Sequence, residues 1–198
     1  DRHSAVRFRY NPQRDSGDLD RSHRFHFDPG LPCDCQQTAT EAYPPGLDRG
    51  HRVPANHLDH DPVGIRQTNF MTNIKPRVAW MNRGAWLVTE ALVACHRDEM
   101  ELLLVGGPLW LTKGCVPPSH GVEIPSHYWK LVVSSEQIIA WVIPNTAEAT
   151  RAAQDTCAVN PSRLETVYGL PIPEPSDNEL AGAPVFADWW MPEACDRS

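Results

Sequence analysis

The aliphatic run from Met100 to Gly106 places the strongest constraint on how this chain can fold. From Leu102 to Val105 its side chains are aliphatic in succession, so both faces of the segment have to be covered, which predicts a buried central strand. Segments 128–133 and 137–143, separated by Ser-Ser-Glu, predict a hairpin that extends the same sheet. Ala5 to Tyr10 alternates apolar and charged residues, which predicts a half-buried strand. His23 to Phe27 is predicted to be a further strand, paired antiparallel with it.

Two segments have the pattern of helices. Asn82 to Arg97 predicts a helix, because its apolar residues recur at helical spacing. A short helix is predicted from Pro161 to Tyr168, with Asn160 as its cap and proline at its first position. With 198 residues, 41% of them hydrophobic, the chain is long enough for one sizeable core. We therefore expect a single α+β domain over residues 1–198, with a central mixed or antiparallel sheet flanked by helices.

The segment from Pro171 to Pro192 is rich in proline and is predicted to be irregular, docked onto the body by its Trp189-Trp190 pair. Trp110, Trp129 and Trp141 are interpreted as core or sheet-face residues in preference to platforms for stacked bases. The longest apolar runs have the length of strands, and the charged start lacks the apolar core of a signal peptide. We therefore expect no membrane partner.

Residues with chemical roles are concentrated between Leu47 and Glu90. An Asp-Arg-Gly-His block ends at His51, whose unperturbed pKa of about 6.5 leaves it mostly a free base at neutral pH. Gly50 permits a close or left-handed backbone approach, and Arg49 offers a forked donor suited to phosphate oxygens. A base, a divalent cation and a phosphate-binding cation are what metal-assisted phosphodiester hydrolysis requires.

Asn82 fits the metal-binding role, since its amide oxygen is a hard neutral ligand that Mg²⁺ accepts while it keeps most of its waters. A helix N-cap is the alternative role for this asparagine. Glu90 follows eight residues later, which on an ideal helix means about 80° of rotation and about 12 Å of rise. Both side chains therefore cannot grip one ion directly, and Glu90 is expected to reach a metal-bound water or to orient a neighbour. An exposed helix charge is the alternative role for Glu90.

The order and spacing of these motifs resemble the DNA/RNA non-specific endonuclease family. The motifs are DRGH, then TNI-x-P, then N-x-G-A-W with a glutamate eight residues after that asparagine. The resemblance implies a ββα-metal (His-Me finger) site in which His51 is the general base. It further implies that Asn82 is the single protein ligand of Mg²⁺ and that Glu90 lies near the metal-bound waters.

Other residues are assigned by the same resemblance. Asn73 matches the asparagine of TNI-x-P, an active-site support, and Arg49 matches the arginine of DRGH. Arg24, in HRFHFDPG, is the candidate for an upstream phosphate-binding arginine. The family often carries a basic residue one turn after the helix glutamate, where this chain has Ala94, so that contact is missing or supplied elsewhere. The segment IPSHYWKLVV resembles the family strand P-x-x-(Y/F)-(W/F)-K.

The function implied by the resemblance is that of a metal-dependent endonuclease, a hydrolase that cuts phosphodiester bonds in DNA and RNA with Mg²⁺, or with Mn²⁺ as a substitute. The expected products carry 5′-phosphate and 3′-hydroxyl ends. Low specificity is expected because the sequence has no recognisable base-reading module, and phosphate contacts carry no sequence information. Two alternatives stay open, a nuclease toxin module of a larger secreted effector and a catalytically silent nucleic-acid-binding domain. A homodimer and a protein inhibitor are further partners left open.

Six cysteines are an even number and a high one for an intracellular chain of this length. Disulfides formed in an oxidising compartment are the favoured interpretation, so we expect a secreted protein, extracellular or periplasmic. The resemblance points to a bridge between Cys157 and Cys195, which occurs in some secreted members. The remaining cysteines allow three pairings, which the sequence leaves open; they are Cys33, Cys35, Cys95 and Cys115.

The formal net charge of −7 is unusual for a protein that acts on nucleic acid, since phosphate binding usually requires a basic patch. Any such patch must be local, which predicts modest and salt-sensitive affinity. Scattered solubilising charges are the alternative. The cations expected to form the patch are Arg24, Arg49, Arg52, Arg66, Lys75, Arg77 and Arg83.

A zinc cluster is the alternative use of the histidines that follow DRGH. Imidazole and carboxylate groups suit zinc, but no helical spacing places His51 on one face with His57 and His60. A polar surface helix and loop are therefore favoured for this region, which also contains Asp59 and Asp61.

Overall fold

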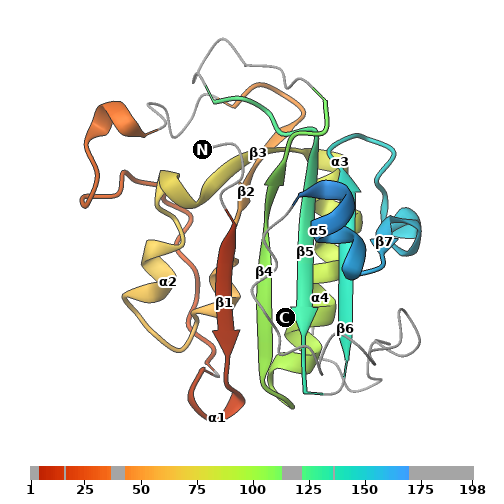
Figure 1. The fold of residues 1–198 in the computed structure, drawn as a ribbon. Helices are drawn as coiled ribbons and strands as arrows, with labels where there is room; N and C mark the ends of the chain where they lie inside the picture. Colours follow the sequence, from red (N-terminus) through yellow and green to blue (C-terminus); the bar gives the residue numbers. More distant parts are fainter. Residues whose placement is uncertain (1–4, 16, 37–42, 113–121, 136, 170–198) are drawn as a thin grey trace.

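A five-stranded sheet forms the centre of the molecule, and every neighbouring pair of its strands is antiparallel (Figure 1). The structure is a computed structural model that describes residues 5–15, 17–36, 43–112, 122–135 and 137–169, so the predicted proline-rich segment and its tryptophan pair lie outside it. The strand order is β1-β4-β5-β6-β7. The strands are β1 Val6–Tyr10, β4 Leu102–Leu109, β5 His127–Val133, β6 Ile138–Pro144 and β7 Ala158–Val159.

The two faces of this sheet contribute to two separate clusters of buried residues. Along β5, Tyr128 and Val132 belong to one cluster, whereas Trp129 and Leu131 belong to the other. Side chains alternate between the faces of a strand, so β5 is covered on both sides, as its continuous apolar sequence predicted. Trp129 and Trp141 are buried in these clusters, which confirms that they are core residues.

A helix covers each face of the sheet (Figure 1). The long helix α4 (Ala85–Arg97) packs on one face, and its buried residues recur at helical spacing. The short helix α5 (Ser162–Tyr168) covers the other face through the fully buried Leu164. Asn160 accepts a hydrogen bond from the backbone N–H of Ser162 at 3.0 Å, although the helix begins one residue later than predicted.

A separate two-stranded sheet leads into these helices. β2 (Leu47–His51) pairs antiparallel with β3 (Ile74–Val78), and His51 lies opposite Ile74. The helix α3 (Ala79–Arg83) follows β3 directly, and α4 follows α3. The chain therefore forms a strand–strand–helix unit in the stretch where the DRGH and N-x-G-A-W motifs lie.

Short helical elements connect the strands. Among the described residues, no helix is both long enough and apolar enough to cross a membrane. The connecting elements are α1 Pro12–Asp15, η1 Cys33–Cys35, η2 Ala55–His57, α2 Gly64–Gln67, η3 Met71–Asn73, η4 Arg151–Ala153 and η5 Asp155–Cys157.

The prediction of a strand from His23 to Phe27 is wrong. Strand β1 pairs with β4 instead, and the segment makes only an isolated parallel bridge between His26 and Phe70. The backbone of His26 donates to Asn69 and accepts from Met71, so this pairing is limited to a single residue. The aromatic side chains of the segment contact His51 and Phe70, and the segment does not join the central sheet.

The prediction of one helix from Asn82 to Arg97 also requires correction, because the chain breaks at Gly84 between α3 and α4. A Cβ atom at Gly84 would overlap the backbone oxygens of Trp80 and Ala149, so only glycine permits this close approach. Asn82 therefore belongs to a short helix of its own and does not cap α4.

The cysteines are paired less completely than their even number suggested. Cys157 is a free cysteine, which contradicts the predicted bridge to Cys195, a residue outside the described part of the chain. Cys157 packs as a small apolar side chain in one of the core clusters, and burial raises the pKa of its thiol. Cys33 and Cys35 are free and exposed, whereas Cys95 is disulfide-bonded.

Candidate active site

His51, the last residue of β2, has its ring held by Asn69. The ring nitrogen Nε2 lies 2.9 Å from the amide oxygen of Asn69, and the amide nitrogen of Asn69 donates to the backbone oxygen of Ser22 at 2.6 Å. The second bond fixes which end of the amide faces the ring, so Nε2 is the donor and carries the proton in the neutral imidazole. Nδ1 is then the basic nitrogen of His51.

The environment of His51 keeps the imidazole neutral. Burial lowers its pKa from the usual value, and the hydrogen bond to Asn69 and the charge of Glu90 oppose this shift only in part. The ring of Phe25 packs against the imidazole with 5.6 Å between centroids. His51 is therefore a free base at neutral pH, as its proposed role requires.

Phe25 also connects the two arginines that the sequence assigned to phosphate binding. The guanidinium carbon of Arg49 lies 4.2 Å from the centre of the Phe25 ring, and Arg24 is the neighbouring residue along the chain. Arg24 is exposed, and its backbone atoms bond Ser22 and His26. Both arginines thus lie on or beside the segment that packs on His51.

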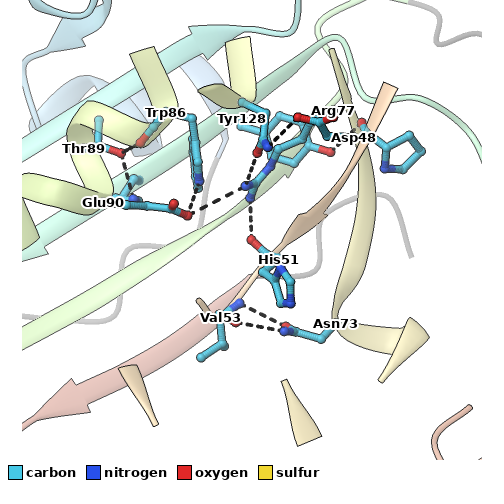
Figure 2. Close-up of polar contacts among 12 residues, drawn as sticks. Asp48, His51, Val53, Asn73, Arg77, Trp86, Thr89, Glu90 and Tyr128 are labelled. Carbon is cyan, nitrogen blue, oxygen red and sulfur yellow. Dashed lines mark hydrogen bonds and ion pairs between the residues drawn. The ribbon is translucent and has the colours of Figure 1, made fainter. Parts of the chain in front are cut away.

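Asn73 holds the backbone that follows His51. Its amide oxygen accepts from the N–H of Val53 at 3.0 Å, and its amide nitrogen donates to the carbonyls of Val53 at 2.9 Å and Thr68 at 2.8 Å. Figure 2 shows the paired bonds between Asn73 and Val53 beside His51. These contacts are those of a structural support for the backbone beside His51.

Asn82 is fixed at both ends of its amide. Its nitrogen donates to a carboxylate oxygen of Asp48 at 3.0 Å, and its oxygen accepts from a guanidinium nitrogen of Arg77 at 3.2 Å. Asp48 is held in turn by the exposed Arg83, which donates to both carboxylate oxygens at 2.9 and 2.7 Å. The first residue of DRGH thus orients the amide that the resemblance implies as the metal ligand.

Arg77 runs through the middle of the site (Figure 2). It donates to the backbone oxygen of His51 at 2.6 Å, and its guanidinium lies 4.1 Å from the ring centre of Trp86 and 4.7 Å from that of Tyr128. A Cβ at Gly50 would overlap the Cδ of Arg77, so the glycine of DRGH leaves room for this side chain. Gly50 is needed for a close approach and not for a left-handed backbone conformation.

The side chain of Glu90 points from α4 toward the guanidinium of Arg77. One of its carboxylate oxygens accepts from the indole nitrogen of Trp86 at 2.6 Å and lies 3.9 Å from a nitrogen of Arg77. That same nitrogen of Arg77 bonds Asn82, so the two residues meet at one guanidinium despite the break at Gly84. The separation calculated for one ideal helix therefore does not apply to this pair.

Lys130 of β5 supports the apolar side of the site. Its ammonium donates to the hydroxyl of Thr89 at 2.8 Å and lies 4.2 Å from the ring centre of Trp86. Burial lowers the pKa of Lys130 to about 7, against the opposing charge of Glu90. The strand that resembles the family's P-x-x-(Y/F)-(W/F)-K pattern thus places a tyrosine and a lysine against the helix that carries Glu90.

The residues considered for zinc have structural partners elsewhere. The ring of His57 stacks on Phe8 with 5.9 Å between centroids, Asp59 pairs with Arg97 at 3.1 Å, and His60 lies 3.6 Å from Asp15. Among the described residues, no group of three or more histidine, cysteine, aspartate and glutamate side chains could hold a metal ion.

The predicted basic patch is only partly realised. Arg77 is buried and cannot reach a phosphate, which corrects its assignment to the patch. Arg24, Arg66 and Arg83 are exposed, and the other three cations are half-buried.

The donor set fits a hydrated Mg²⁺ held by one protein ligand. The Asn82 oxygen has two lone pairs, of which Arg77 takes one, and the bond from its nitrogen to Asp48 keeps the oxygen aimed into the site. Glu90 and Asp48 add negative charge nearby, and a hard cation that keeps its waters requires no cluster of charged ligands. The buried charge of Arg77 acts against the ion.

Four residues of the site have contacts that the sequence did not predict. They are Asp48, Asn69, Lys130 and Arg77, and only Arg77 had been assigned a role, in the basic patch. Two of these residues lie inside recognised motifs, since Asp48 begins DRGH and Lys130 ends the Y-W-K pattern. Asn69 and Arg77 flank the TNI-x-P motif and carry no signal of their own. Their roles emerge only from contacts with residues distant in sequence.

A half-buried imidazole, an oriented amide and a carboxylate, all supplied by a strand–strand–helix unit, define an α+β protein with a nuclease-type site. A model of the DNA/RNA non-specific endonuclease family matches residues 2–176. The chain therefore belongs to the DNA/RNA non-specific endonuclease family, which confirms the family and the enzyme class predicted from its motifs.

Several relatives are similar over most of the chain. Nuclease C1 of Cunninghamella echinulata var. echinulata is 26% identical over 169 residues, which are 77% of this chain and 67% of that protein. The human mitochondrial nuclease EXOG is 29% identical over 174 residues, 78% of this chain and 47% of that protein. Human mitochondrial endonuclease G is 23% identical over 80% of this chain and 59% of its own length. The chain thus spans between about half and two thirds of the length of these relatives.

The fold agrees with a solved structure. The EndoG chain in a crystal structure of the EndoG/EndoGI complex superposes with a TM-score of 0.74 at 21% identity, covering 85% of this chain and 77% of that one. This likeness confirms the α+β fold with a central antiparallel sheet.

Proposed function

We propose that this chain is a Mg²⁺-dependent endonuclease that hydrolyses phosphodiester bonds in DNA and RNA. His51 is its general base and Asn82 is the single protein ligand of the ion. The observation that best supports this proposal is the meeting of both residues at Arg77, which donates to the backbone of His51 at 2.6 Å and to the amide oxygen of Asn82 at 3.2 Å. Membership of the endonuclease family supports the reaction class.

The reaction begins when Nδ1 of His51 takes a proton from the attacking water. Asn69 occupies Nε2 and so fixes the tautomer, and the low pKa keeps the Nδ1 lone pair available at neutral pH. The water oxygen bonds to phosphorus as the bond to O3′ breaks, and the departing O3′ takes a proton from water, which leaves 5′-phosphate and 3′-hydroxyl ends.

A bound Mg²⁺ supplies a Lewis acid that offsets the charge on the phosphate and on the departing O3′. Asn82 would hold this cofactor through its amide oxygen, and Glu90, whose carboxylate accepts from the indole of Trp86, would orient water near it. Arg49 of β2, stacked on Phe25, and Arg24, the neighbour of Phe25, are the cations placed to hold the phosphate. Mn²⁺ is expected to substitute, since it accepts the same hard oxygen ligands.

Low sequence specificity follows from the kind of contact that the site offers. The exposed cations Arg24, Arg66 and Arg83 are suited to phosphates, which are alike in every sequence and in both nucleic acids. The net charge of −7 limits binding to this local region, so affinity should be modest and should fall as salt rises.

Cleavage of a supercoiled plasmid and of a single-stranded RNA, each with Mg²⁺ and with EDTA, tests the proposal. We expect nicked and then linear plasmid and RNA fragments with Mg²⁺, and neither with EDTA. Arg9→Gln is the matched control. Arg9 is an exposed residue of β1 that pairs with Glu101, so its replacement should not affect the rate. Cleavage that survives EDTA would contradict the proposed metal role, and cleavage under no condition would favour the silent scaffold.

A location in an oxidising compartment is also proposed, supported by the disulfide at Cys95. Mass spectrometry of the protein purified from its source without reductant tests it, with a reduced Cys95 as the contrary result. A homodimer and a protein inhibitor remain predictions that size-exclusion chromatography and affinity capture can examine.

A further inference from the structure

Arg77 is buried to a degree that is unusual for an arginine. Only 1% of the residue is exposed, and its Nε has no hydrogen-bond partner in the described part of the protein. The ion pair that it makes there is with Glu90 at 3.9 Å, which is long for a charge-assisted contact. The buried charge of Arg77 is therefore only partly neutralised.

The same charge lies beside the place of the proposed metal ion. The nitrogen of Arg77 that approaches Glu90 also donates to the Asn82 oxygen at 3.2 Å. A Mg²⁺ bound to that oxygen at about 2.1 Å would be no more than about 5 Å from this nitrogen. Two positive charges at this distance repel, and the low solvent exposure of Arg77 leaves little water to screen them.

We propose that Arg77 sets the affinity of the site for divalent cations, weakening it through its buried charge while it aims the Asn82 oxygen. This inference rests on the proposed function. It makes Arg77 a positioning residue, because its burial keeps it from the substrate and its contacts act through Asn82 and the backbone of His51.

The size of the effect follows from the charges. A unit positive charge about 5 Å from a divalent ion lowers the affinity for that ion by about tenfold, compared with a neutral group at the same place, even in a medium as polarisable as water. Removal of the Arg77 charge should therefore tighten metal binding by about tenfold.

The experiment compares Mg²⁺ binding by calorimetry, and Mn²⁺ binding by electron paramagnetic resonance, among four variants and the wild type. Arg77→Gln and Arg77→Met remove the charge, and methionine also keeps an apolar stem between Trp86 and Tyr128. Arg77→Lys keeps the positive charge but loses the forked set of guanidinium N–H donors. Arg9→Gln removes an exposed charge from β1 as the matched control. Thermal melting tests whether each variant is folded.

We expect both neutral variants to bind either metal about tenfold more tightly, and Arg77→Lys and Arg9→Gln to stay within about threefold of the wild type. Unchanged or weaker binding in a folded neutral variant would overturn the inference, as would tighter binding by Arg77→Lys. Loss of folding in both neutral variants would also count against it, since the charge would then serve the fold. A wild type that binds neither metal refutes the proposed function itself, a result distinct from any of these.

Discussion

The imidazole of His51 and the amide of Asn69 form a directed pair, with Nε2 donating to an amide oxygen 2.9 Å away. Asn69 is itself buried and anchored to the backbone of Ser22, so the ring cannot turn without losing its bond to an acceptor that is fixed in place. The tautomer of the base is thus decided by a residue outside the motifs that identify the family.

The pH dependence of cleavage should report the low pKa of His51. Burial lowers the pKa, so the basic form persists below pH 6.5, and activity is lost only as pH falls through the lower folded value. We expect the acid limb of kcat/KM to lie below pH 6.5. Asn69→Leu removes an acceptor that favours the charged ring and should move the limb lower still, whatever it does to the maximum rate. A limb above 6.5 in the wild type would contradict the assignment of His51.

Replacement of the base should separate chemistry from folding. His51→Ala is expected to lower kcat by about 10²–10⁴, the usual contribution of a general base. Its loss of one hydrogen bond and one aromatic contact should cost about 1–2 kcal/mol in the free energy of unfolding. Single-turnover kinetics and urea unfolding measure the two effects, and equal cleavage rates would remove His51 from the mechanism.

Asn82→Ala should act on metal binding. Without the amide oxygen the ion has no protein ligand, so the Mg²⁺ concentration for half-maximal cleavage is expected to rise by at least about tenfold, the equivalent of one charge-assisted contact. Calorimetric titration with Mg²⁺ provides the independent check. If metal affinity is unchanged while cleavage is lost, the ligand assignment is wrong.

Acid stability should depend on His57, which is fully buried. Burial lowers the pKa of His57 to about 3, below its unfolded value of 6.5, so the folded state holds fewer protons between these values. The stabilising contribution is complete above pH 6.5 and falls by about 1.4 kcal/mol for each pH unit below it. His57→Leu should flatten this dependence, and the difference between variant and wild type cancels other titrating groups. Parallel curves from chemical denaturation would contradict it.

Gly50→Ala tests the close approach within DRGH. The added methyl would overlap the side chain of Arg77, so the core must shift, at a cost of about 1–3 kcal/mol in stability. Cleavage should fall as well, because the displaced Arg77 holds both His51 and Asn82. Gly30→Ala, in an exposed segment, is the control expected to change neither. A stable and fully active Gly50→Ala variant would show that Arg77 has more room than its contacts suggest.

Periodic sequence predicted most of the sheet and both covering helices, since alternation and helical spacing are local properties. The segment from His23 to Phe27 failed because its aromatic side chains serve contacts with His51 and Phe70 that no local pattern encodes. The break between α3 and α4 is indicated by the glycine of N-x-G-A-W, since a glycine inside a helical pattern can mark the end of a helix. The bridge to Cys195 was inferred from a resemblance and not from the residues around Cys157.

Residue type suggested His51, Asn82 and Glu90 as candidates for the site, and the structure brings all three to Arg77. The residues that orient them were not, because Arg77 and Asn69 act through partners up to 47 positions away. A buried arginine is also contrary to what composition leads one to expect, since charged residues are rarely fully buried. Long-range packing decided these roles.

The discontinuity at Gly84 divides the site between two independently anchored bodies. Asn82 is tied to the hairpin through Asp48 and Arg77, whereas Glu90 travels with α4 on the face of the large sheet. The position of the amide thus depends on the hairpin, and the position of the acid depends on the packing of α4 against the large sheet. Disturbing the core beneath α4 would therefore displace the carboxylate while the attachment point of the cation keeps its own anchors.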